Sequence, residues 1–425
     1  MREDVLLKPL TTFKCGGPAK YFDEPASEEE IISDLKFARD NGLDVFILGG
    51  GANCLISDKG FDGLVIKIGK GLSSFNIEDK GDTAVVTAGA GMLLMSFGLK
   101  VAEAGFEGTE FACGIPGTLG GGVFMNAGAY GGEMKDIVKK VRYIDEDLSI
   151  KELTGEDLQF EYRSSIFAEM ARSDKSFVIT EVTAEVKKGN SEEIQARISE
   201  YREKRMKSQP LNVPSAGSTF KRPEGLFAGK LIDDAGLRGY SREGSKAQVS
   251  PKHCGFIVNN DGEASAKEVY ELIMDVSNKV HDKFGVRLDP EVRIIGDFGD
   301  GTRVEISSFG FKYGMPEDTD LILDARSLKN PYWVPELRPL SGLDKPIKKY
   351  LSSFPETSRL ITGFRGAVLL ASAQKDNGVF RVAVGCTGGH HRSVYCAESL
   401  AGKLRDLGYI VNVTHRDIDK DTCDE

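Results

Sequence analysis

The chain has 425 residues and a net charge of −10 at pH 7; its length predicts two to four domains of roughly 100–200 residues each, and its negative charge argues against general nucleic-acid binding. It contains no run of about 18 apolar residues and no apolar signal-peptide run at its start, which predicts no transmembrane helix, no membrane partner and no secretion. Seven cysteines, an odd number without a CxxC pair, indicate free thiols in a reducing cytoplasm and no metal site.

The first part of the chain alternates predicted helices and strands. Ser27-Glu28-Glu29-Glu30 has the capping-box pattern of a helix start, and Gly42 is placed to end that helix. Short apolar runs predict strands at 45–48, 64–68 and 84–88. Further along the chain we expect a charged helix at 190–207, a second capping box at 265–268 that opens another amphipathic helix, and a strand-like segment at 286–295.

The segment 296–301 is rich in Gly and Asp, which predicts a linker. Behind it, strand-like runs at 321–324 and 379–384 and an amphipathic helix at 394–407 predict a small α/β unit. The tail 415–425 holds five acidic and two basic residues, so it does not have the composition of a nucleic-acid-binding arm.

A first glycine cluster, Gly49-Gly50-Gly51, follows the strand predicted at 45–48. It departs from the G-x-G-x-x-G dinucleotide loop because Cys54 stands at the third glycine and no helix pattern follows, and it lacks the Lys of a Walker loop. Backbone without side chains can still direct its N–H groups at a pyrophosphate. A tight turn between two strands is the alternative for this cluster taken alone.

A second stretch, 114–132, holds far more glycine than a structural turn needs. Its composition suits a bulky planar cofactor lying against the backbone, with Thr118 and Asn126 as polar anchors. The predicted cofactor-binding residues are Gly49, Gly50, Gly51, Ala52, Asn53, Gly114, Ile115, Pro116, Gly117, Thr118, Gly120, Gly121, Asn126, Gly128 and Ala129.

Together the two clusters resemble the UDP-N-acetylenolpyruvoylglucosamine reductases (the MurB family) of peptidoglycan synthesis. The resemblance covers about residues 1–297 and continues through motifs at 10–13, 162–165, 214–223, 253–259 and 290–293. It implies two FAD-binding subdomains (1–70 and 71–205) of the vanillyl-alcohol-oxidase (PCMH) type of fold, then an α+β substrate domain (206–297). The short span from Ala228 to Val249 is similar to the compact form of the family, which lacks an inserted substrate-clamping Tyr.

The resemblance also implies the chemistry and the residues that carry it. NADPH reduces FAD, and the flavin passes hydride to UDP-N-acetyl-enolpyruvoylglucosamine, which gives UDP-N-acetylmuramate. Arg163 is expected to stabilise the substrate carboxylate and enolate, Ser218 to donate the proton to carbon, and Glu291 to assist as a charged or hydrogen-bonding partner. Taken singly, these residues also fit a surface ion pair, a loop hydroxyl and a strand carboxylate.

Five further residues are expected near the diphosphate of the UDP-amino-sugar substrate. The alternative for such groups is a solvated surface position, and Arg222 stands where some relatives carry Asn. The predicted substrate-binding residues are Lys207, Gln209, Lys221, Arg222 and His253.

In the second half, the strand predicted at 379–384 leads into a glycine-rich loop, 385–393, and then a helix. A Gly-rich loop at a helix N-terminus that also carries Arg392 favours phosphate binding. The spacing Cys386-x-x-Gly389-x-x-Arg392-Ser393 also satisfies the loop of Cys-dependent phosphatases, in which the Cys is the nucleophile. A structural strand-to-helix turn with a buried Cys is the third interpretation.

The loop 385–393 and motifs at 309–316, 324–326, 330–332, 337–339 and 342–344 resemble the C-terminal domain of the RapZ-type RNase adapter family. The resemblance spans about 303–420, inside a predicted domain 303–425 after a linker 298–302, and implies amino-sugar-phosphate sensing and RNA or protein contacts. The acidic tail argues against RNA, and Tyr332 replaces a His of other members. The predicted anion site is Tyr332, Cys386, Thr387, Gly388, Gly389 and Arg392.

The sequence therefore predicts an FAD- and NADPH-dependent reductase fused to a regulatory domain that binds an amino-sugar phosphate as effector. An RNA or protein adapter and a Cys-dependent phosphatase are the alternatives for the second half. A flavin oxidase of another sugar is the alternative for the first half, because a flavin-binding fold does not by itself fix the chemistry.

Overall fold

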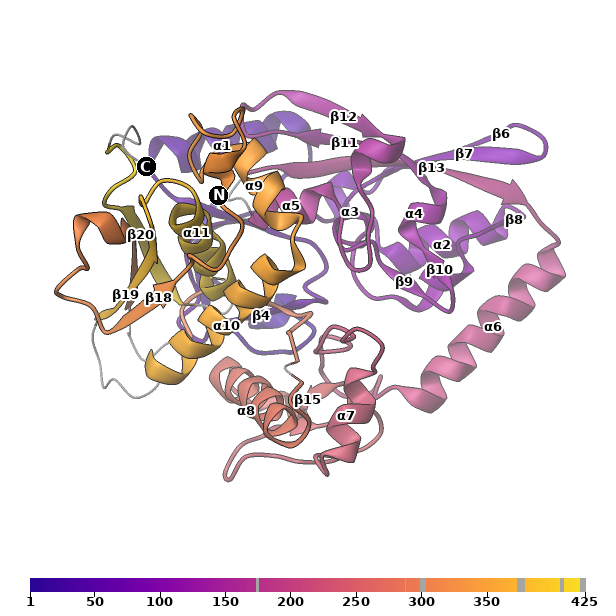
Figure 1. Cartoon of the computed structure of the whole chain (residues 1–425). Helices are drawn as coiled ribbons and strands as arrows, with labels where there is room; N and C mark the ends of the chain where they lie inside the picture. The colour runs from indigo at the N-terminus through magenta and orange to yellow at the C-terminus, as the bar shows by residue number, and fades with distance from the viewer. Residues whose placement is uncertain (173–175, 287, 299–302, 373–378, 406–408, 421–425) are drawn as a thin grey trace. The chain divides into compact units, whose positions relative to one another are not determined.

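The structure is a computed structural model that describes residues 1–172, 176–286, 288–298, 303–372, 379–405 and 409–420 (Figure 1). The chain forms two compact units, Met1–Gly296 and Asp297–Glu425. Of the predicted linker 298–302, only Phe298 lies within the described residues. The finer boundaries at 70/71 and 205/206 stay predictions, and the helix α6 (Ser191–Ser208) runs across the second of them.

The first sheet of unit 1 has the strand order β1-β2-β5-β3, in which β2, β5 and β3 run parallel. Helix α1 (Glu28–Asp40) starts as predicted, because the Ser27 hydroxyl accepts the Glu30 N–H at 3.3 Å. Its Ile31 and Leu35 pack into one core with Leu64 of β5. The predicted strands 45–48 and 64–68 are confirmed: the strands are β1 (Arg2–Leu6), β2 (Pro18–Asp23), β3 (Asp44–Leu48) and β5 (Phe61–Lys67).

The second sheet of unit 1 is antiparallel and follows the order β12-β11-β13-β7-β6, with β8 also paired to β13. Along β7, buried Ala84, Val86 and Ala88 alternate with half-buried residues, so one face of the sheet meets the core. The strands are β6 (Phe75–Asp79), β7 (Thr83–Gly89), β8 (Phe106–Glu107), β11 (Val138–Ile144), β12 (Ile150–Thr154) and β13 (Val178–Lys188). The helices and the small hairpin beside them are α2 (Leu94–Glu103), α3 (Leu119–Phe124), α4 (Met134–Ile137), α5 (Ile166–Arg172), β9 (Gly128–Ala129) and β10 (Gly132–Glu133).

Helix α6 reaches from the neighbourhood of β8 to a third region that holds α7 and α8 (Figure 1). The helix predicted at 190–207 is confirmed: the side chain of Asn190 caps its start, and Pro210 follows its end. Helix α8 begins with the predicted capping box, formed by Ser265 and Glu268, and ends at the left-handed Gly285. The elements of this region are α7 (Ala228–Asp234), α8 (Ala266–Phe284), β14 (Ala247–Val249) and β15 (Ile257–Asn259).

The strand predicted at 286–295 is wrong in its length. Of the described residues in this range, only Arg293–Ile295 form a strand, β16, which pairs in parallel with β4 (Cys54–Ile56), directly after the first glycine loop. The residues before β16 bond to a neighbouring loop instead: the Lys221 N–H donates to the Asp289 carbonyl, and the Glu291 N–H donates to the Thr219 carbonyl. These hydrogen bonds between distant segments, which a local sequence pattern does not predict, place Glu291 at the edge of the glycine loop.

Unit 2 is built on a parallel sheet of order β18-β19-β17-β20. The predicted strands 321–324 and 379–384 are confirmed, and the helix predicted at 394–407 begins earlier, at Arg392; its last two residues lie outside the described ranges. Because parallel strands end at one edge, Gly310 and Cys386 face each other in register there. The elements are β17 (Arg303–Gly310), β18 (Leu321–Asp324), β19 (Val379–Cys386), β20 (Ile410–His415), α9 (Lys345–Ser352), α10 (Pro355–Ser372) and α11 (Arg392–Arg405).

Two further features concern membrane-spanning helices and the state of the cysteines. Within the described ranges, no helix combines the length and hydrophobicity that crossing a bilayer requires. The six cysteines of those ranges are free thiols, and Cys423 lies outside them. The reducing cytoplasm stays a prediction.

Candidate functional site

The two glycine loops of unit 1 lie against each other, backbone to backbone. A Cβ atom on Gly50 would stand 2.5 Å from the Gly117 Cα, and one on Gly49 would stand 2.5 Å from the Thr118 hydroxyl oxygen. Real Cβ atoms do not approach other atoms that closely, so glycine is required at both positions. Gly49 and Gly50, which were predicted to bind the cofactor, are therefore also needed for the contact between the two loops.

The first loop also keeps hydrogen-bond donors for a ligand. Among the described residues, the backbone N–H groups of Gly50, Gly51, Ala52 and Asn53 have no acceptor, while the Gly51 carbonyl accepts from the Thr12 N–H. Successive free N–H groups beside glycine form a concave site that suits an anion. This set of donors fits the pyrophosphate of a dinucleotide such as FAD.

Two predicted anchors use their side chains inside the protein. The Thr118 hydroxyl is buried and caps α3 by accepting the Gly121 N–H at 3.4 Å. Asn126 is fully buried, and its amide donates to Glu133 Oε2 at 3.0 Å and to the Glu161 carbonyl at 2.9 Å. These hydrogen bonds occupy both amide hydrogens of Asn126 and one lone pair of the Thr118 hydroxyl oxygen. Contact of the two residues with the cofactor stays a prediction.

Arg163 and Glu291 form an ion pair although 128 residues separate them. Arg163 Nε donates to Glu291 Oε1 at 2.9 Å, and Arg163 NH2 donates to the Gly128 carbonyl at 3.2 Å. Both side chains are largely shielded, with exposed fractions of 23% and 14%. The pairing brings one predicted catalytic residue from the FAD-binding region against another from the third region.

The location of Glu291 follows from strand pairing. It lies two residues before β16, and Asn53 lies one residue before β4, so the parallel pair places both at one edge. The Asn53 side-chain amide donates to the Glu291 carbonyl at 3.2 Å. Burial raises the pKa of the Glu291 carboxyl, and the positive charges of Arg163 and Lys221 oppose that rise.

Ser218 joins the same neighbourhood through its neighbour in the chain. Thr219 is fully buried, and its backbone carbonyl accepts the Glu291 N–H at 2.8 Å, whereas Ser218 is exposed. Gly217, with φ of +78°, forms the turn before it. Ser218 is therefore exposed at the surface and adjacent in the chain to Thr219, the residue that is hydrogen-bonded to Glu291. Of the predicted substrate-binding residues, Lys221 is the one whose positive charge acts on the Glu291 carboxyl.

The other predicted substrate residues make no contact with the Arg163–Glu291 pair in the described part of the chain. The Lys207 ammonium is 80% exposed beside Glu203, and Gln209 holds its Oε1 buried without a hydrogen bond. The Arg222 guanidinium covers an exposed ring, that of Phe227, at 4.5 Å. His253 accepts the Gly255 N–H at its Nδ1, and burial lowers the pKa of this histidine.

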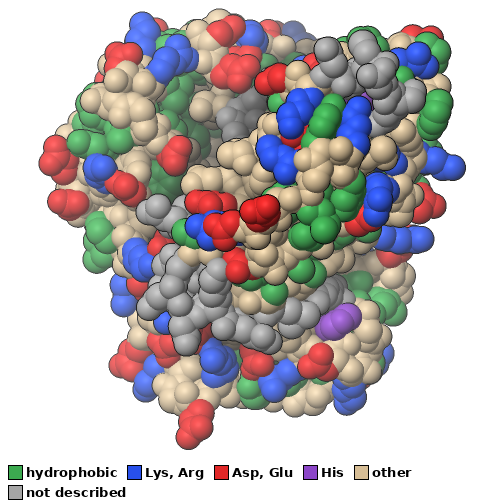
Figure 2. All heavy atoms as spheres, turned by 60° about the vertical axis from the view of Figure 1, so that its left-hand side comes forward, with side chains coloured by type: hydrophobic (Ala, Val, Ile, Leu, Met, Phe, Trp, Pro, Cys, Tyr) green, Lys and Arg blue, Asp and Glu red, His purple; other side chains and the backbone are tan. Residues whose placement is uncertain are grey.

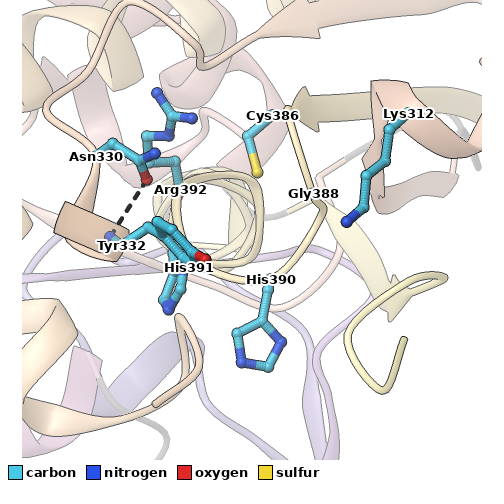
Figure 3. Close-up of a pocket in the computed structure, with 8 residues that line it drawn as sticks. All are labelled: Lys312, Asn330, Tyr332, Cys386, Gly388, His390, His391 and Arg392. Atoms are coloured by element: carbon cyan, nitrogen blue, oxygen red, sulfur yellow. Dashed lines mark hydrogen bonds between the residues drawn. The ribbon is translucent and has the colours of Figure 1, made fainter. Parts of the chain in front are cut away.

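Unit 2 carries a pocket at the carboxyl edge of its sheet, where β19 enters the loop before α11 (Figure 3). Cys386 Sγ accepts the Gly389 N–H at 3.3 Å and donates to the Ser393 hydroxyl at 3.2 Å. Thr387 supports the pocket by accepting from Arg392 NH2 at 3.2 Å. The lining residues are Lys312, Asn330, Tyr332, Cys386, Gly388, His390, His391 and Arg392.

The predicted anion site is thus brought together, since Tyr332, Cys386, Gly388 and Arg392 line the pocket, and Thr387 and Gly389 bond to them. Sequence reasoning missed Lys312, Asn330 and the histidine pair as lining residues. The two histidines stand inside the glycine loop itself, so their position was the available signal.

The pocket offers buried nitrogen atoms without partners. Arg392 NH1 donates to the carbonyls of Arg326 and Leu328, but Arg392 Nε has no hydrogen bond. His391 Nε2 is likewise buried and unpartnered, and burial lowers the pKa of His391 to about 4, so the ring is neutral at pH 7. Both residues are only 6% exposed. No carboxyl group is among the described lining residues, so the pocket is suited to an anionic ligand with hydrogen-bond acceptors.

Comparison with known proteins matches three family models along the chain. Residues 19–154 match the FAD binding domain, and residues 209–295 match the UDP-N-acetylenolpyruvoylglucosamine reductase C-terminal domain. Residues 302–419 match the RapZ C-terminal domain. The matches confirm the expected fold class, an FAD-binding region of the PCMH type, an α+β reductase C-terminal domain and a small α/β domain.

Individual relatives cover unit 1. A UDP-N-acetylenolpyruvoylglucosamine reductase of Lachnoclostridium phytofermentans is 48% identical over 291 residues, which are 68% of this chain and 91% of the relative. The reductase of Clostridioides difficile is 44% identical over 70% of this chain and 94% of its own. The crystal structure of MurB from Thermus caldophilus superposes with a TM-score of 0.57 at 34% identity, covering 69% of this chain and 98% of that one.

Proposed function

The chain belongs to the UDP-N-acetylenolpyruvoylglucosamine reductase family, and we propose from this premise that unit 1 uses FAD to reduce the enolpyruvyl group of that sugar nucleotide in peptidoglycan precursor synthesis. NADPH is the proposed hydride donor. The observation that carries the proposal is the Arg163–Glu291 pair, at 2.9 Å, hydrogen-bonded through Asn53 to the loop that fits the FAD pyrophosphate.

Bound FAD would supply the hydride that adds to the vinyl carbon of the substrate. Hydride addition leaves negative charge on the substrate carboxylate and enolate, which must be met by a positive group already in position. Arg163 is that group in our proposal. Its Nε and NH2 are held by Glu291 and Gly128, while its NH1 has no hydrogen-bond partner among the described residues and is left for the carboxylate.

Besides the positive group that stabilises the enolate, the reaction needs a proton donor for the enolate carbon. The exposed Ser218 hydroxyl is our candidate, because its chain neighbour Thr219 is bonded directly to Glu291. Burial raises the pKa of the Glu291 carboxyl, and this direction supports its part as a hydrogen-bonding partner of the reacting groups. Lys221, Lys207, Gln209, Arg222 and His253 remain our proposed contacts to the diphosphate.

The replacement Ser218→Ala tests the assignment of the proton donor. We expect the full-length variant to bind FAD and to be reduced by NADPH at the normal rate. Its reoxidation by the enolpyruvyl sugar nucleotide should slow at least ~100-fold, since general acid catalysis contributes roughly that much. Unchanged reoxidation, measured by stopped-flow absorbance, would favour a flavin oxidase of another sugar over this reductase.

For unit 2 we propose binding of an amino-sugar phosphate that adjusts the activity of unit 1. The unpartnered Arg392 Nε and His391 Nε2 support an anion with several acceptor oxygens, and Lys312 adds charge at the pocket. Regulation additionally requires that the ligand bind two states of the enzyme with different affinity.

Calorimetric titration of the full-length protein with glucosamine 6-phosphate tests this second proposal. Heat of binding together with a change in turnover is the expected result, and the absence of both rejects it. Release of inorganic phosphate during the titration would instead support the phosphatase alternative, which the missing carboxyl group among the described lining residues speaks against.

The RNA-adapter alternative has less support from the composition of the tail 415–425, which holds five acidic and two basic residues. Positive and negative side chains are interspersed on the face that Figure 2 shows. A mobility shift at physiological salt that disappears on Arg392→Ala would favour this alternative.

A further inference from the structure

A buried network behind Arg163 is used by none of the roles assigned above. Arg163 has a left-handed backbone with φ of 55°, which costs a residue with a side chain roughly 1 kcal/mol or more. Its turn is closed by two backbone bonds, from the Glu161 N–H to the Ser164 carbonyl at 3.0 Å and in the reverse direction at 3.2 Å. Other contacts must hold this strained turn in one orientation.

Asn126 supplies that contact. Its amide donates one hydrogen to the Glu161 carbonyl at 2.9 Å and the other to Glu133 Oε2 at 3.0 Å, while its oxygen accepts the Lys135 N–H at 3.0 Å. The side chain is fully buried. With every donor and its oxygen in use, Asn126 has one orientation, and the Glu133 carboxylate, which can only accept, helps to select it.

Glu133 also lies beside the other support of Arg163. In the hairpin, Gly128 of β9 faces Glu133 of β10 in register, and a Cβ on Gly128 would stand 2.6 Å from the Glu133 Cγ. The Gly128 carbonyl is the group that accepts from Arg163 NH2. The Glu133 side chain therefore covers the same short strand that holds the guanidinium.

A surface ion pair does not account for this placement. Glu133 bonds Lys135 at 2.8 Å, but the lysine side chain is 48% exposed, whereas that of Glu133 is 24% exposed. Exposed pairs of this kind contribute little to stability. The Glu133 carboxylate instead lies close enough to the Arg163 guanidinium for the two charges to interact.

We propose that Glu133 is a positioning residue for Arg163, acting on the turn through Asn126 and on the guanidinium through Gly128. The inference rests on the proposed reduction of the enolpyruvyl sugar nucleotide and adds a residue that the sequence motifs did not single out. Glu133 touches neither substrate nor cofactor in this role. Its loss lets the guanidinium move away from the place where the substrate carboxylate develops charge.

The test compares the two half-reactions of full-length Glu133→Ala and Glu133→Gln with those of the unmodified protein. In Glu133→Ala, we expect FAD content and reduction by NADPH to stay normal, while kcat/KM for the sugar nucleotide falls about 10- to 100-fold, because small misplacements of a catalytic group have effects of that size. Glu133→Gln keeps an acceptor for Asn126 and should recover part of the loss. The matched control is Glu152→Ala, which removes a carboxylate that is 43% exposed and paired with Lys140.

The other possible results reject either the positioning role of Glu133 or the proposed function. Normal reoxidation of Glu133→Ala overturns the positioning role, and so does a parallel loss of FAD and of both half-reactions, which marks a purely structural residue. Failure of the unmodified protein to be reoxidised by the sugar nucleotide rejects the proposed function itself, and the positioning role falls with it.

Discussion

The two candidate sites satisfy their buried charges in different ways. In unit 1, Arg163 is paired with a carboxylate, that of Glu291, whose own pKa is raised by burial. In unit 2, Arg392 is held by backbone carbonyls and keeps an unpartnered Nε. A titratable carboxyl group can exchange a proton, whereas a cation fixed by neutral carbonyls and a hydroxyl attracts an anion. The difference favours chemistry in the first unit and recognition in the second.

The largest effect that this comparison predicts is that of Arg163→Ala. Removing the cation that meets the developing charge should lower kcat/KM for the sugar nucleotide about 10²- to 10³-fold. Reduction of FAD by NADPH should be unaffected, and both rates are accessible to stopped-flow absorbance. The control is Lys140→Ala, which removes a half-buried cation paired with Glu152. Retained activity in Arg163→Ala would remove the central charge from the proposed mechanism.

A smaller loss, about 10²-fold, is expected for Glu291→Gln, together with a changed pH profile. Because the folded-state pKa of Glu291 is raised, activity that needs its proton falls as pH rises through that pKa, above the range of an ordinary glutamate. Glutamine does not titrate, so this limb should vanish. A profile of kcat/KM against pH that is identical in variant and parent would contradict the assignment.

The raised pKa of Glu291 also makes the free energy of unfolding depend on pH. The contribution of Glu291 to the free energy of unfolding is fully present below the unfolded-state pKa and is lost as pH rises through the folded-state pKa. In Glu291→Gln, stability should therefore fall less between acid and neutral pH than in the parent, and urea unfolding at several pH values measures the difference.

The smallest effect concerns the pocket of unit 2. Lys312 lines it and is exposed, so Lys312→Ala should weaken binding of an amino-sugar phosphate about fivefold without changing thermal stability. Lys329→Ala removes an exposed lysine that does not line the pocket and is the matched control. Equal affinities in both variants would show that the anion binds elsewhere.

Local sequence signals predicted much of the fold because their physics is local. Ser27 and Ser265 cap their helices as their patterns indicate. The strand β16 is shorter than the strand predicted at 286–295, because residues before it are hydrogen-bonded to a loop far away in the sequence. In unit 2, β17 and β20 were not anticipated, since parallel strands become evident only from their neighbours in the sheet.

In the candidate site, too, the sequence predicted the identity of residues better than their contacts with distant parts of the chain. Family motifs named Arg163, Ser218 and Glu291, and the structure brings them into one neighbourhood, but no spacing rule predicts a contact across 128 residues. Asn126 was interpreted as an anchor for a cofactor because a polar residue among glycines resembles a ligand contact. Its hydrogen bonds to Glu133 and Glu161 appear only once the hairpin and the Arg163 turn are placed together.

The central claim is tested most directly by an anaerobic spectrum of the full-length protein. We predict flavin absorbance bands that NADPH bleaches and that stoichiometric UDP-N-acetyl-enolpyruvoylglucosamine restores. A folded protein that binds no FAD, or whose bleached bands stay bleached after the sugar nucleotide is added, would contradict the account.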